Sequence, residues 1–445
     1  MNLADDLAFL NLVFYALLGA AGASVLAIVP ALHIYNVAGF LLLLSGSLAP
    51  VLSPEELAFL FLGMITGYSI LNTIPSIFLS VPDDSTVFIV LPGQKYLMQR
   101  RGYEAVVLSG MGSLGGLAVL ALLTPVAARL FPVVRAILQP HVGWILWTVI
   151  AYMLISEWPK GSDRAPAGWR RWWEGWKSLT AGLVTFTLSG LLGFVLMYRS
   201  LVPVQVAYQN LLPAFVGLFA VPWVVQNLLA HIELPPQHFT RSVDAPLGVL
   251  FHGTAAGVLG GLFAAFFPVV TGGLGGFLAG HATAQRDERA FIISQGASKV
   301  VYYVGGFLFF FVPGLHLTRG GMAWMISTLY STYTPERYYW ATAAILLAGV
   351  VAFFLSLGLT RVVIALTSRV SYHTITWVTL GILLAVVWGM TGIGGLAVCA
   401  VATGIGSIPV LWGSRRMNAM GVLLLPIALN MVGAGGVIAG WLGLL

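Results

Sequence analysis

The amino-acid sequence predicts an all-α polytopic membrane protein, and three observations support this fold class. Hydrophobic residues make up 59% of the 445 residues and charged residues only 8%, whereas a soluble domain carries about 25% charged residues. Apolar stretches of about 20 residues, long enough to span a bilayer, recur along the chain, and we count about 10–12 of them. They lack the alternation of a membrane barrel, so backbone hydrogen bonding in hydrocarbon requires helices.

The N-terminal apolar stretch from Leu7 to Pro30 is too long for the core of a signal peptide, and no basic segment precedes it. We therefore expect a first helix that is retained in the membrane. The single cysteine, Cys399, excludes an internal disulfide and a thiolate metal cluster, and its apolar neighbours suit a buried small residue. The net charge of +6 lies in loops, which fits an inner-membrane protein and does not indicate nucleic-acid binding.

The longest polar stretch, Glu157 to Lys177, is rich in basic residues and tryptophan, which suits a segment at the lipid headgroups. We place it on the cytoplasmic side, together with the basic loop at Lys95 to Arg101, because two apolar stretches separate the two loops. The polar stretch divides the predicted domains into a first membrane repeat at 1–156, an interfacial loop at 157–177, and a second repeat with C-terminal helices at 178–445.

An internal repeat links the two halves. Two glycines precede Pro30 by eleven and eight residues, and two glycines precede Pro268 by the same intervals. A short stretch of small and polar residues follows each proline, and an acidic residue, Glu55 or Asp287, opens the next matching helix. The four glycines are Gly19, Gly22, Gly257 and Gly260. The shared order and spacing favour duplication over chance similarity among apolar helices.

Each repeat places a proline and a glycine-tolerant stretch inside a segment that should be helical. Irregular backbone at membrane depth persists only when it is buried in protein or lines a cavity, and paired interruptions mark the binding site of many transporters. We therefore expect interrupted or re-entrant helices that meet near the midplane in two pseudo-symmetric repeats. The segment from Val202 to Ile232 contains three prolines. If it forms a hairpin, the two repeats are inverted.

Lys299 is the first candidate for holding an anion. It lies eleven residues after Glu288 in an apolar segment, and a charged lysine near mid-membrane costs about 2.5 to 3.5 kcal/mol and usually faces a cavity or the bundle interior. The alternative is a structural lysine that bonds backbone carbonyls.

The loops after the two prolines supply further candidates for binding a substrate. His33 and Asn36 lie in the first loop, and Thr271, Gly272 and Gly273 lie in the second. Helix N-termini at such loops attract anions by about 0.3 to 1 kcal/mol. Each of these side chains could equally serve packing or a helix cap.

A polar run follows the apolar helix after Glu55. Asn72 and Ser76 are candidates for binding substrate, and Asp83 and Asp84 are candidates for binding a coupling ion, H⁺ or Na⁺. A solvated pair of loop aspartates is the alternative. With His33, the same pair could in principle serve an intramembrane hydrolase. No metal site, cofactor or ATP-binding loop is expected.

Together with these residues, several blocks of sequence carry a resemblance to a known family. They are Ile74 to Phe78, Asp83 to Thr86, Leu91 to Gly93, Arg101 to Ala105, Leu212 to Phe219, Ala402 to Pro409 and Arg415 to Gly421. In these blocks the chain resembles the large membrane subunit of tripartite tricarboxylate transporters, above all its stand-alone, archaeal-type relatives. The resemblance implies a permease, and not an enzyme, that moves an organic carboxylate.

Family members with a tricarboxylate substrate carry a Pro-Gly pair in each repeat loop, where this chain has Pro30-Ala31 and Pro268-Val269. This departure leaves the substrate open. The second loop is also similar in shape to that of polyprenyl-phosphate translocases, so a flippase of a lipid-linked phosphate is the runner-up function and an intramembrane hydrolase the third. We expect membrane lipid and an anionic substrate as partners; the oligomeric state stays open, with a homodimer among the alternatives.

Overall fold

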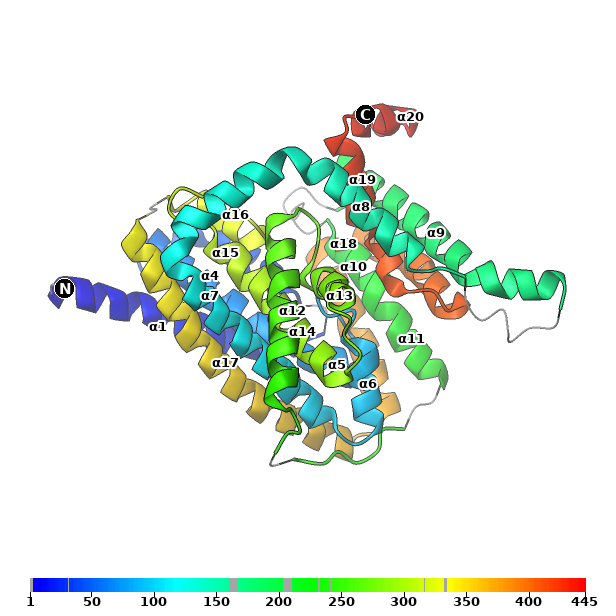
Figure 1. Ribbon diagram of the computed structural model, residues 1–445, viewed down its shortest axis with the longest axis horizontal. Coiled ribbons are helices and arrows are strands. Elements are labelled where there is room, and N and C mark those ends of the chain that lie inside the picture. Colours follow the sequence, from blue (N-terminus) through cyan, green and yellow to red (C-terminus); the bar gives the residue numbers. More distant parts are fainter. Residues whose placement is uncertain are drawn as a thin grey trace. The chain divides into compact units, whose positions relative to one another are not determined.

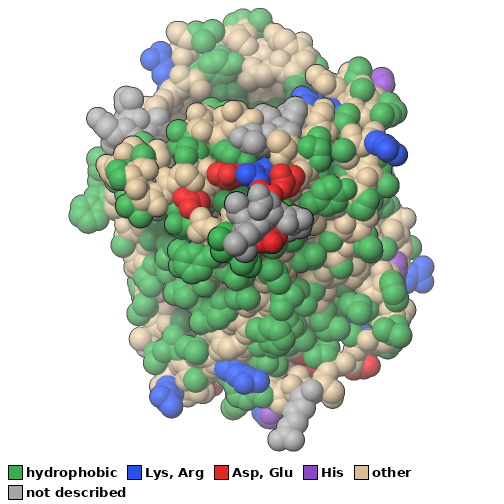
Figure 2. All heavy atoms as spheres, turned by 90° about the vertical axis from the view of Figure 1, so that its left-hand side faces the viewer, with side chains coloured by type: hydrophobic (Ala, Val, Ile, Leu, Met, Phe, Trp, Pro, Cys, Tyr) green, Lys and Arg blue, Asp and Glu red, His purple; other side chains and the backbone are tan. Residues whose placement is uncertain are grey.

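The computed structural model describes residues 3–30, 32–159, 167–202, 210–230, 233–240, 242–315, 317–331 and 334–445 (Figure 1). This part of the chain is helical and contains no strand, which confirms the all-α class. By length and composition, eight of its helices could cross a membrane, or nine if one bent pair near the C-terminus is a single span. Two of the eight, Gly102–Ile155 with 54 residues and Tyr372–Trp412 with 41 residues and a kink at Gly392, have the length of about two crossings each, so the expected 10–12 spans stay a prediction. One face of the molecule carries a broad hydrophobic area, with charged side chains gathered above it and along its lower edge (Figure 2).

The chain forms two compact units. Unit 1 contains Met1–Ile137 and Ile232–Ile375, and unit 2 contains Leu138–His231 and Thr376–Leu445. Both loops after the repeat prolines, and every candidate site residue, belong to unit 1. These units follow spatial contacts, whereas the boundaries at 156 and 178 follow the internal repeat, so the repeat boundaries stay a prediction.

In the first half of unit 1, helices are interrupted where proline and polar residues remove hydrogen bonds. Ser53 and Glu56 form a reciprocal cap at the start of the fourth helix, which ends one residue before Asn72, and Pro75 follows in the next helix. The helices are α1 (Leu3–Leu26), α2 (Ile34–Leu43), α3 (Ser45–Leu48), α4 (Pro54–Leu71), α5 (Thr73–Phe78), α6 (Val90–Met98) and α7 (Gly102–Leu138).

The second half of unit 1 repeats this pattern. Thr271 caps the short helix after Pro268, and Asp287 caps the next one by accepting from Arg289 N. A π-helical turn follows Val300, and such turns are frequent at functional sites. The elements are α12 (Leu247–Phe266), α13 (Gly272–Ala282), α14 (Glu288–Val300), η5 (Val301–Gly305), α15 (Gly306–Leu308), α16 (Gly321–Ser327) and α17 (Pro335–Arg369).

Matching helices of the two halves pack in the same way. A Cβ atom on Gly63 or Gly67 of α4 would collide with the backbone of Ala16 or Ala20 of α1. A Cβ atom on Gly257 or Gly261 of α12 would collide with Ser294 or Ser298 of α14. In both pairs the two helices run parallel and approach closely because small residues face each other. Gly19 and Gly257, equivalent in the predicted repeat, both make such contacts, whereas Gly22 meets nothing.

The helices α4 and α14 run in opposite directions. Contacts at rising positions along α4 are made at falling positions along α14 and its continuation: Phe59 with Phe311 (ring centroids 5.8 Å apart), Tyr68 with Tyr303 (6.1 Å), and Asn72 with Lys299 (2.7 Å). Since α1 runs parallel to α4 and α12 parallel to α14, the two matched pairs are antiparallel to each other. An inverted repeat requires such an arrangement, and the repeat itself stays a prediction.

Unit 2 contains the remaining helices, and its described part differs from one expectation. Leu212–Ala230 forms one continuous helical stretch, because Pro213 lies in the first turn, where its missing N–H costs nothing. Pro222 is the second residue of α11, directly after the π-helical turn Val216–Ala220. These two prolines therefore do not divide the segment; Pro203 and Ile232 lie outside the described residues. The elements are η1 (Gln139–His141), α8 (Val142–Ile155), α9 (Trp169–Tyr198), α10 (Leu212–Phe215), η4 (Val216–Ala220), α11 (Val221–Ala230), α18 (Tyr372–Trp412), η6 (Arg416–Met420), α19 (Gly421–Met431) and α20 (Gly435–Trp441). One of these crosses a unit boundary, since α18 begins in unit 1, and the last residue of α7, Leu138, already belongs to unit 2.

The predicted interfacial loop is helical over its second part. The tryptophans at the start of α9, Trp169 and Trp172, are exposed, as expected for side chains at the headgroups. Glu157 is fully buried instead and accepts a hydrogen bond from Arg415 N. Residues 160–166 of the predicted loop lie outside the described residues.

The loop after Pro268 adopts a conformation that favours glycine. Val269 has φ of 56°, in the left-handed region, which costs a β-branched residue about 1–3 kcal/mol. We expect Val269→Gly to raise the free energy of unfolding by about 1 kcal/mol, because the relieved strain exceeds the extra chain entropy of glycine, about 0.5–1 kcal/mol. Thermal unfolding in detergent measures the effect. In Val270→Gly, a matched control at a buried position, the melting temperature should fall. A lower melting temperature for Val269→Gly would show that the loop is not strained.

Candidate functional site

Lys299 lies at the end of α14, where the helix meets the break between α4 and α5. Its side chain is buried, and its Nζ donates to Asn72 Oδ1 (2.7 Å), to Ile70 O (3.4 Å) and to the hydroxyl of Thr73. All three acceptors are neutral, and no carboxylate in the described part lies within 4.0 Å of Nζ. The ammonium therefore uses its three N–H groups without being paired to a negative charge.

Asp83 lies in the loop after α5 and accepts hydrogen bonds from six donors. Its Oδ1 accepts from Ser85 N (2.9 Å), Thr86 N (2.8 Å) and Thr86 Oγ1 (2.8 Å). Its Oδ2 accepts from Asn72 Nδ2 (2.8 Å), Tyr68 OH (3.0 Å) and Tyr303 OH (3.3 Å). A carboxylate offers about four lone-pair positions, so both oxygens of Asp83 are fully used.

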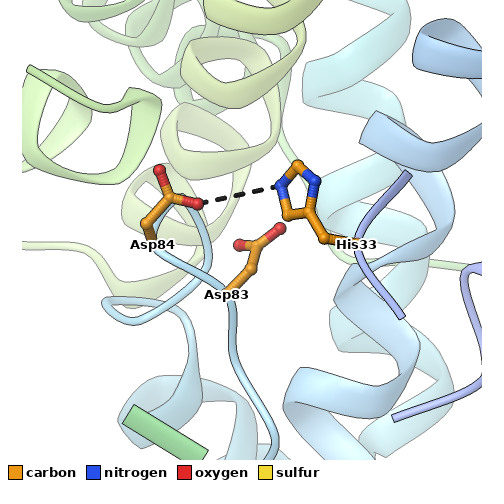
Figure 3. Close-up of side chains that lie close together, drawn as sticks. All are labelled: His33, Asp83 and Asp84. Atoms are coloured by element: carbon orange, nitrogen blue, oxygen red, sulfur yellow. Dashed lines mark ion pairs between the residues drawn. The ribbon is translucent and has the colours of Figure 1, made fainter. Parts of the chain in front are cut away.

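Asp84, His33 and Tyr303 form the neighbouring part of the site. Asp84 Oδ1 lies 3.3 Å from Tyr303 OH and 4.0 Å from His33 Nε2, and His33 Nε2 lies 3.2 Å from the same hydroxyl. Both carboxylates point toward the imidazole ring of His33 (Figure 3). The side chains of His33 and Asp84 are 21% and 17% exposed, whereas Asn72 and Thr86 are buried.

The second repeat loop packs against the acidic loop of the first half. Thr271 Oγ1 donates to Asp84 O (3.0 Å), and Gly272 O accepts from Ser298 Oγ (2.6 Å). A Cβ on Gly273 would come within 2.7 Å of Ser85 O, so a larger residue would separate the loops. Thr271 is buried, and in this conformation it positions the backbone of Asp84.

The two other predicted residues lie beside this network. Ser76 Oγ lies 2.8 Å from both Asn72 O and Thr86 Oγ1, so it supports the residues that hold Asp83. Asn36 is buried in α2, and its Nδ2 has no hydrogen-bond partner in the part of the chain that the structure describes. The structure thus connects the predicted residues of both repeats, apart from Asn36, and the role of each in binding stays a prediction.

Sequence reasoning missed four residues of the network: Tyr68, Thr73, Thr86 and Tyr303. Tyr68 lies four residues before Asn72, and Tyr303 lies four residues after Lys299. Side chains four residues apart on a helix share one face, so these tyrosines could have been found from the polar residues that they accompany. Thr73 directly follows Asn72, inside the polar run already singled out.

The chain also matches known sequences. The model of the tripartite tricarboxylate transporter TctA family matches residues 13–421. The chain is 26% identical over 431 residues to an uncharacterized protein of Methanocaldococcus jannaschii, across 94% of this chain and 98% of that protein. No solved structure matches. The family is one of transporters and not of enzymes, and the candidate spans make the chain an integral protein of the cell membrane. The resemblance seen in the sequence is confirmed, and the chain belongs to the tripartite tricarboxylate transporter TctA family.

Proposed function

We propose that the protein is a secondary active transporter that moves an anionic organic solute, a carboxylate, across the membrane. The observation that carries this proposal is the buried ammonium of Lys299, which contacts only neutral acceptors among the described residues. A buried charge is costly unless it is paired. A substrate carboxylate that displaces Thr73 or Asn72 would supply the missing negative charge.

The surroundings of Lys299 support the same reading. The ammonium lies where two interrupted helices from opposite halves meet, which is where many transporters bind their substrate. The N-termini of α2 and α13 begin at His33 and Thr271 and would add weak attraction for an anion. Among the candidate residues, Asn72 and Lys299 would contact the substrate, and Ser76 and the Thr271–Gly273 loop would support them.

Uptake into proteoliposomes tests the proposal. Purified protein is reconstituted, and accumulation of radiolabelled citrate and of a series of shorter dicarboxylates is measured under an imposed proton or sodium gradient. At least one carboxylate should accumulate above the level in protein-free liposomes, and collapsing the gradient should abolish the accumulation. If no carboxylate accumulates while a labelled polyprenyl phosphate crosses the bilayer, the proposal is wrong and the protein translocates lipid-linked phosphate.

A further inference from the structure

We propose that Asp84 carries the coupling proton, whereas Asp83 stays charged and links the proton site to Lys299. This inference rests on the proposed transport function and assigns different roles to the two adjacent aspartates. It also selects H⁺ over Na⁺ as the coupling ion.

The first step is that the lone pairs of both Asp83 oxygens already face hydrogen-bond donors, so a proton or a metal ion would have to displace one of these donors. Six donors surround its two oxygens, and three of them come from the backbone and side chain of its own turn. Hydrogen bonds to a carboxylate stabilise the charged form, each contributing about 1.5–3 kcal/mol. Protonation of Asp83 would force at least one donor to face another donor. Asp83 is therefore an anchor that remains negative through the transport cycle.

The second step is a count of protons around Tyr303. Its hydroxyl lies within 3.3 Å of Asp83 Oδ2, Asp84 Oδ1 and His33 Nε2, yet it has one proton to donate. If the hydroxyl donates to Asp83, the donors left to the Asp84 carboxyl are the backbone N–H groups of Asp84 and Ser85, and a proton on Asp84 can itself be donated to Tyr303 Oη. If Asp84 is charged instead, Tyr303 turns to it. The network therefore has two self-consistent arrangements that differ by one proton on Asp84.

The third step is that Asp84 lies on the exposed side of the network, beside His33. Its Oδ1 lies 4.0 Å from His33 Nε2, and both side chains are partly exposed, unlike Asp83's partners Asn72 and Thr86. His33 Nδ1 accepts from Tyr35 N (3.2 Å), so the neutral ring carries its proton on Nε2 and acts as a donor toward Tyr303 and Asp84. The other titratable groups that face the pair are Tyr35 from α2, Tyr68 from α4, and Tyr302 and Tyr303 from η5, with Lys299 behind Asn72. The tyrosines stay neutral near pH 7, so the proton of Asp84 exchanges on the exposed side of the network.

The fourth step concerns the kind of ion. A hard cation such as Na⁺ is held by several oxygen atoms. Asp84 Oδ1 has one tyrosine hydroxyl and one ring nitrogen as neighbours, and an oxygen of Asp83 lies within 4.8 Å of the Asp84 carboxylate and of the ring of His33. The backbone oxygen of Asp84 is occupied by Thr271, and the oxygens of Asp83 are saturated. A proton needs only the two partners that are present.

The last step connects the proton to the substrate. The amide of Asn72 donates to Asp83 Oδ2 and accepts from Lys299 Nζ, so one side chain bridges the anchor and the ammonium. A carboxylate that binds Lys299 adds a negative charge near the pair of aspartates. This addition favours protonation of Asp84, the only one of the two that can accept a proton. Binding of substrate and of a proton would therefore promote each other, as symport requires.

Two measurements on reconstituted protein test the assignment. The first compares gradient-driven uptake of labelled citrate, or of the best carboxylate found above, with exchange of labelled for unlabelled substrate in the absence of any gradient. In Asp84→Asn we expect uptake to fall to the level of protein-free liposomes while exchange persists and no longer depends on pH. In Asp83→Asn we expect both to be lost and the melting temperature to fall. Glu174→Gln, at an exposed position of α9, is the matched control and should behave like the wild type.

The second measurement does not require transport. Infrared spectroscopy of the purified protein follows the carbonyl band of a protonated buried carboxylic acid as the pH is changed. We expect this band in the wild type and in Glu174→Gln, and its loss in Asp84→Asn. Proton-driven uptake by Asp84→Asn, uptake driven by a sodium gradient alone, or a band that persists in Asp84→Asn would each overturn the inference. Failure of the wild type to take up any carboxylate would overturn the proposed function, and the band would still decide where the proton is held.

Discussion

Replacing Lys299 with alanine is expected to abolish uptake of the carboxylate substrate while leaving the protein folded. The ammonium is the buried positive charge at the junction of the two halves, and its hydrogen-bond partners are neutral. Removing one partner of a buried charge pair costs about 3–5 kcal/mol, which corresponds to a loss of affinity of about 100-fold or more. The fold should survive, because the variant leaves no buried charge without a partner and removes a costly one from the membrane.

Two further substitutions separate the effect of the positive charge of Lys299 on uptake from the effect of its side-chain shape. Lys299→Gln keeps a donor near Asn72 but has no charge, so its uptake should be as low as that of the alanine variant. Lys299→Arg keeps the charge as a planar fork and should restore uptake only in part. Lys177→Ala, which removes a partly exposed lysine of α9, serves as the control. Uptake at the wild-type rate by Lys299→Ala, at saturating and at limiting substrate, would assign Lys299 a structural role.

The residues of the candidate site could be predicted because each is polar or charged within a stretch that is otherwise apolar. A lysine, two adjacent aspartates and a capping threonine stand out within helices of low charge, and membrane segments tolerate such residues mainly where they are satisfied by protein or water. The structure connects Lys299, Asp83, Asp84 and Thr271 through Asn72 and backbone contacts. The repeat helped as well, since it indicated that the loops after Pro30 and Pro268 belong together.

The difference between the two aspartates could not be predicted. Asp83 and Asp84 are neighbours of the same type, and only their hydrogen bonds distinguish them. Three of the bonds to Asp83 come from its own turn, and the other three come from Tyr68 of α4, from Asn72 directly after α4 and from Tyr303 of η5, which approach Asp83 because two helices far apart in sequence run antiparallel. Such a contact has no local signal. The number of spans stays a prediction for a related reason: apolar composition does not reveal whether a long stretch, such as the 54 residues of Gly102–Ile155, crosses the membrane once or twice.

Two groups of ion pairs lie at the starts of the antiparallel helices α4 and α14, and they suggest how access to the site is controlled. At the start of α4, Glu55 pairs with Arg337 (2.6 Å) of α17 and accepts from Tyr330 (3.1 Å). At the start of α14, Glu288 pairs with Lys95 of α6. Each pair joins an element of one half to an element of the other. The helices α4 and α14 run in opposite directions, so their starts lie at opposite ends of the packed helix pair. The two ion pairs therefore lie at opposite ends as well.

Such pairs suit gates that open and close in turn. Partly exposed ion pairs contribute about 0–1 kcal/mol, so breaking one pair while keeping the other costs little. If the repeats are inverted, opening the pair at Glu55 exposes the site to one side of the membrane and opening the pair at Glu288 exposes it to the other. Single cysteines at Glu55 and at Glu288 should then react with an impermeant thiol reagent added from opposite sides. These positions suit labelling better than Thr271, which is buried.

Linking either pair covalently is expected to stop uptake completely. In a Cys399→Ser background, which has no other cysteine, Lys95 and Glu288 are replaced by cysteines in one protein and Glu55 and Arg337 in another. A short, reducible thiol crosslinker should abolish uptake in each protein, since alternating access requires both pairs to separate, and reduction should restore it. The pair Glu174 and Lys177, three residues apart on α9, should tolerate the same crosslink without loss. Undiminished uptake with one pair linked would remove that pair from the gating mechanism. Undiminished uptake with both pairs linked in one protein would mean that the path to Lys299 and Asp84 opens elsewhere, without separation of the starts of α4 and α14.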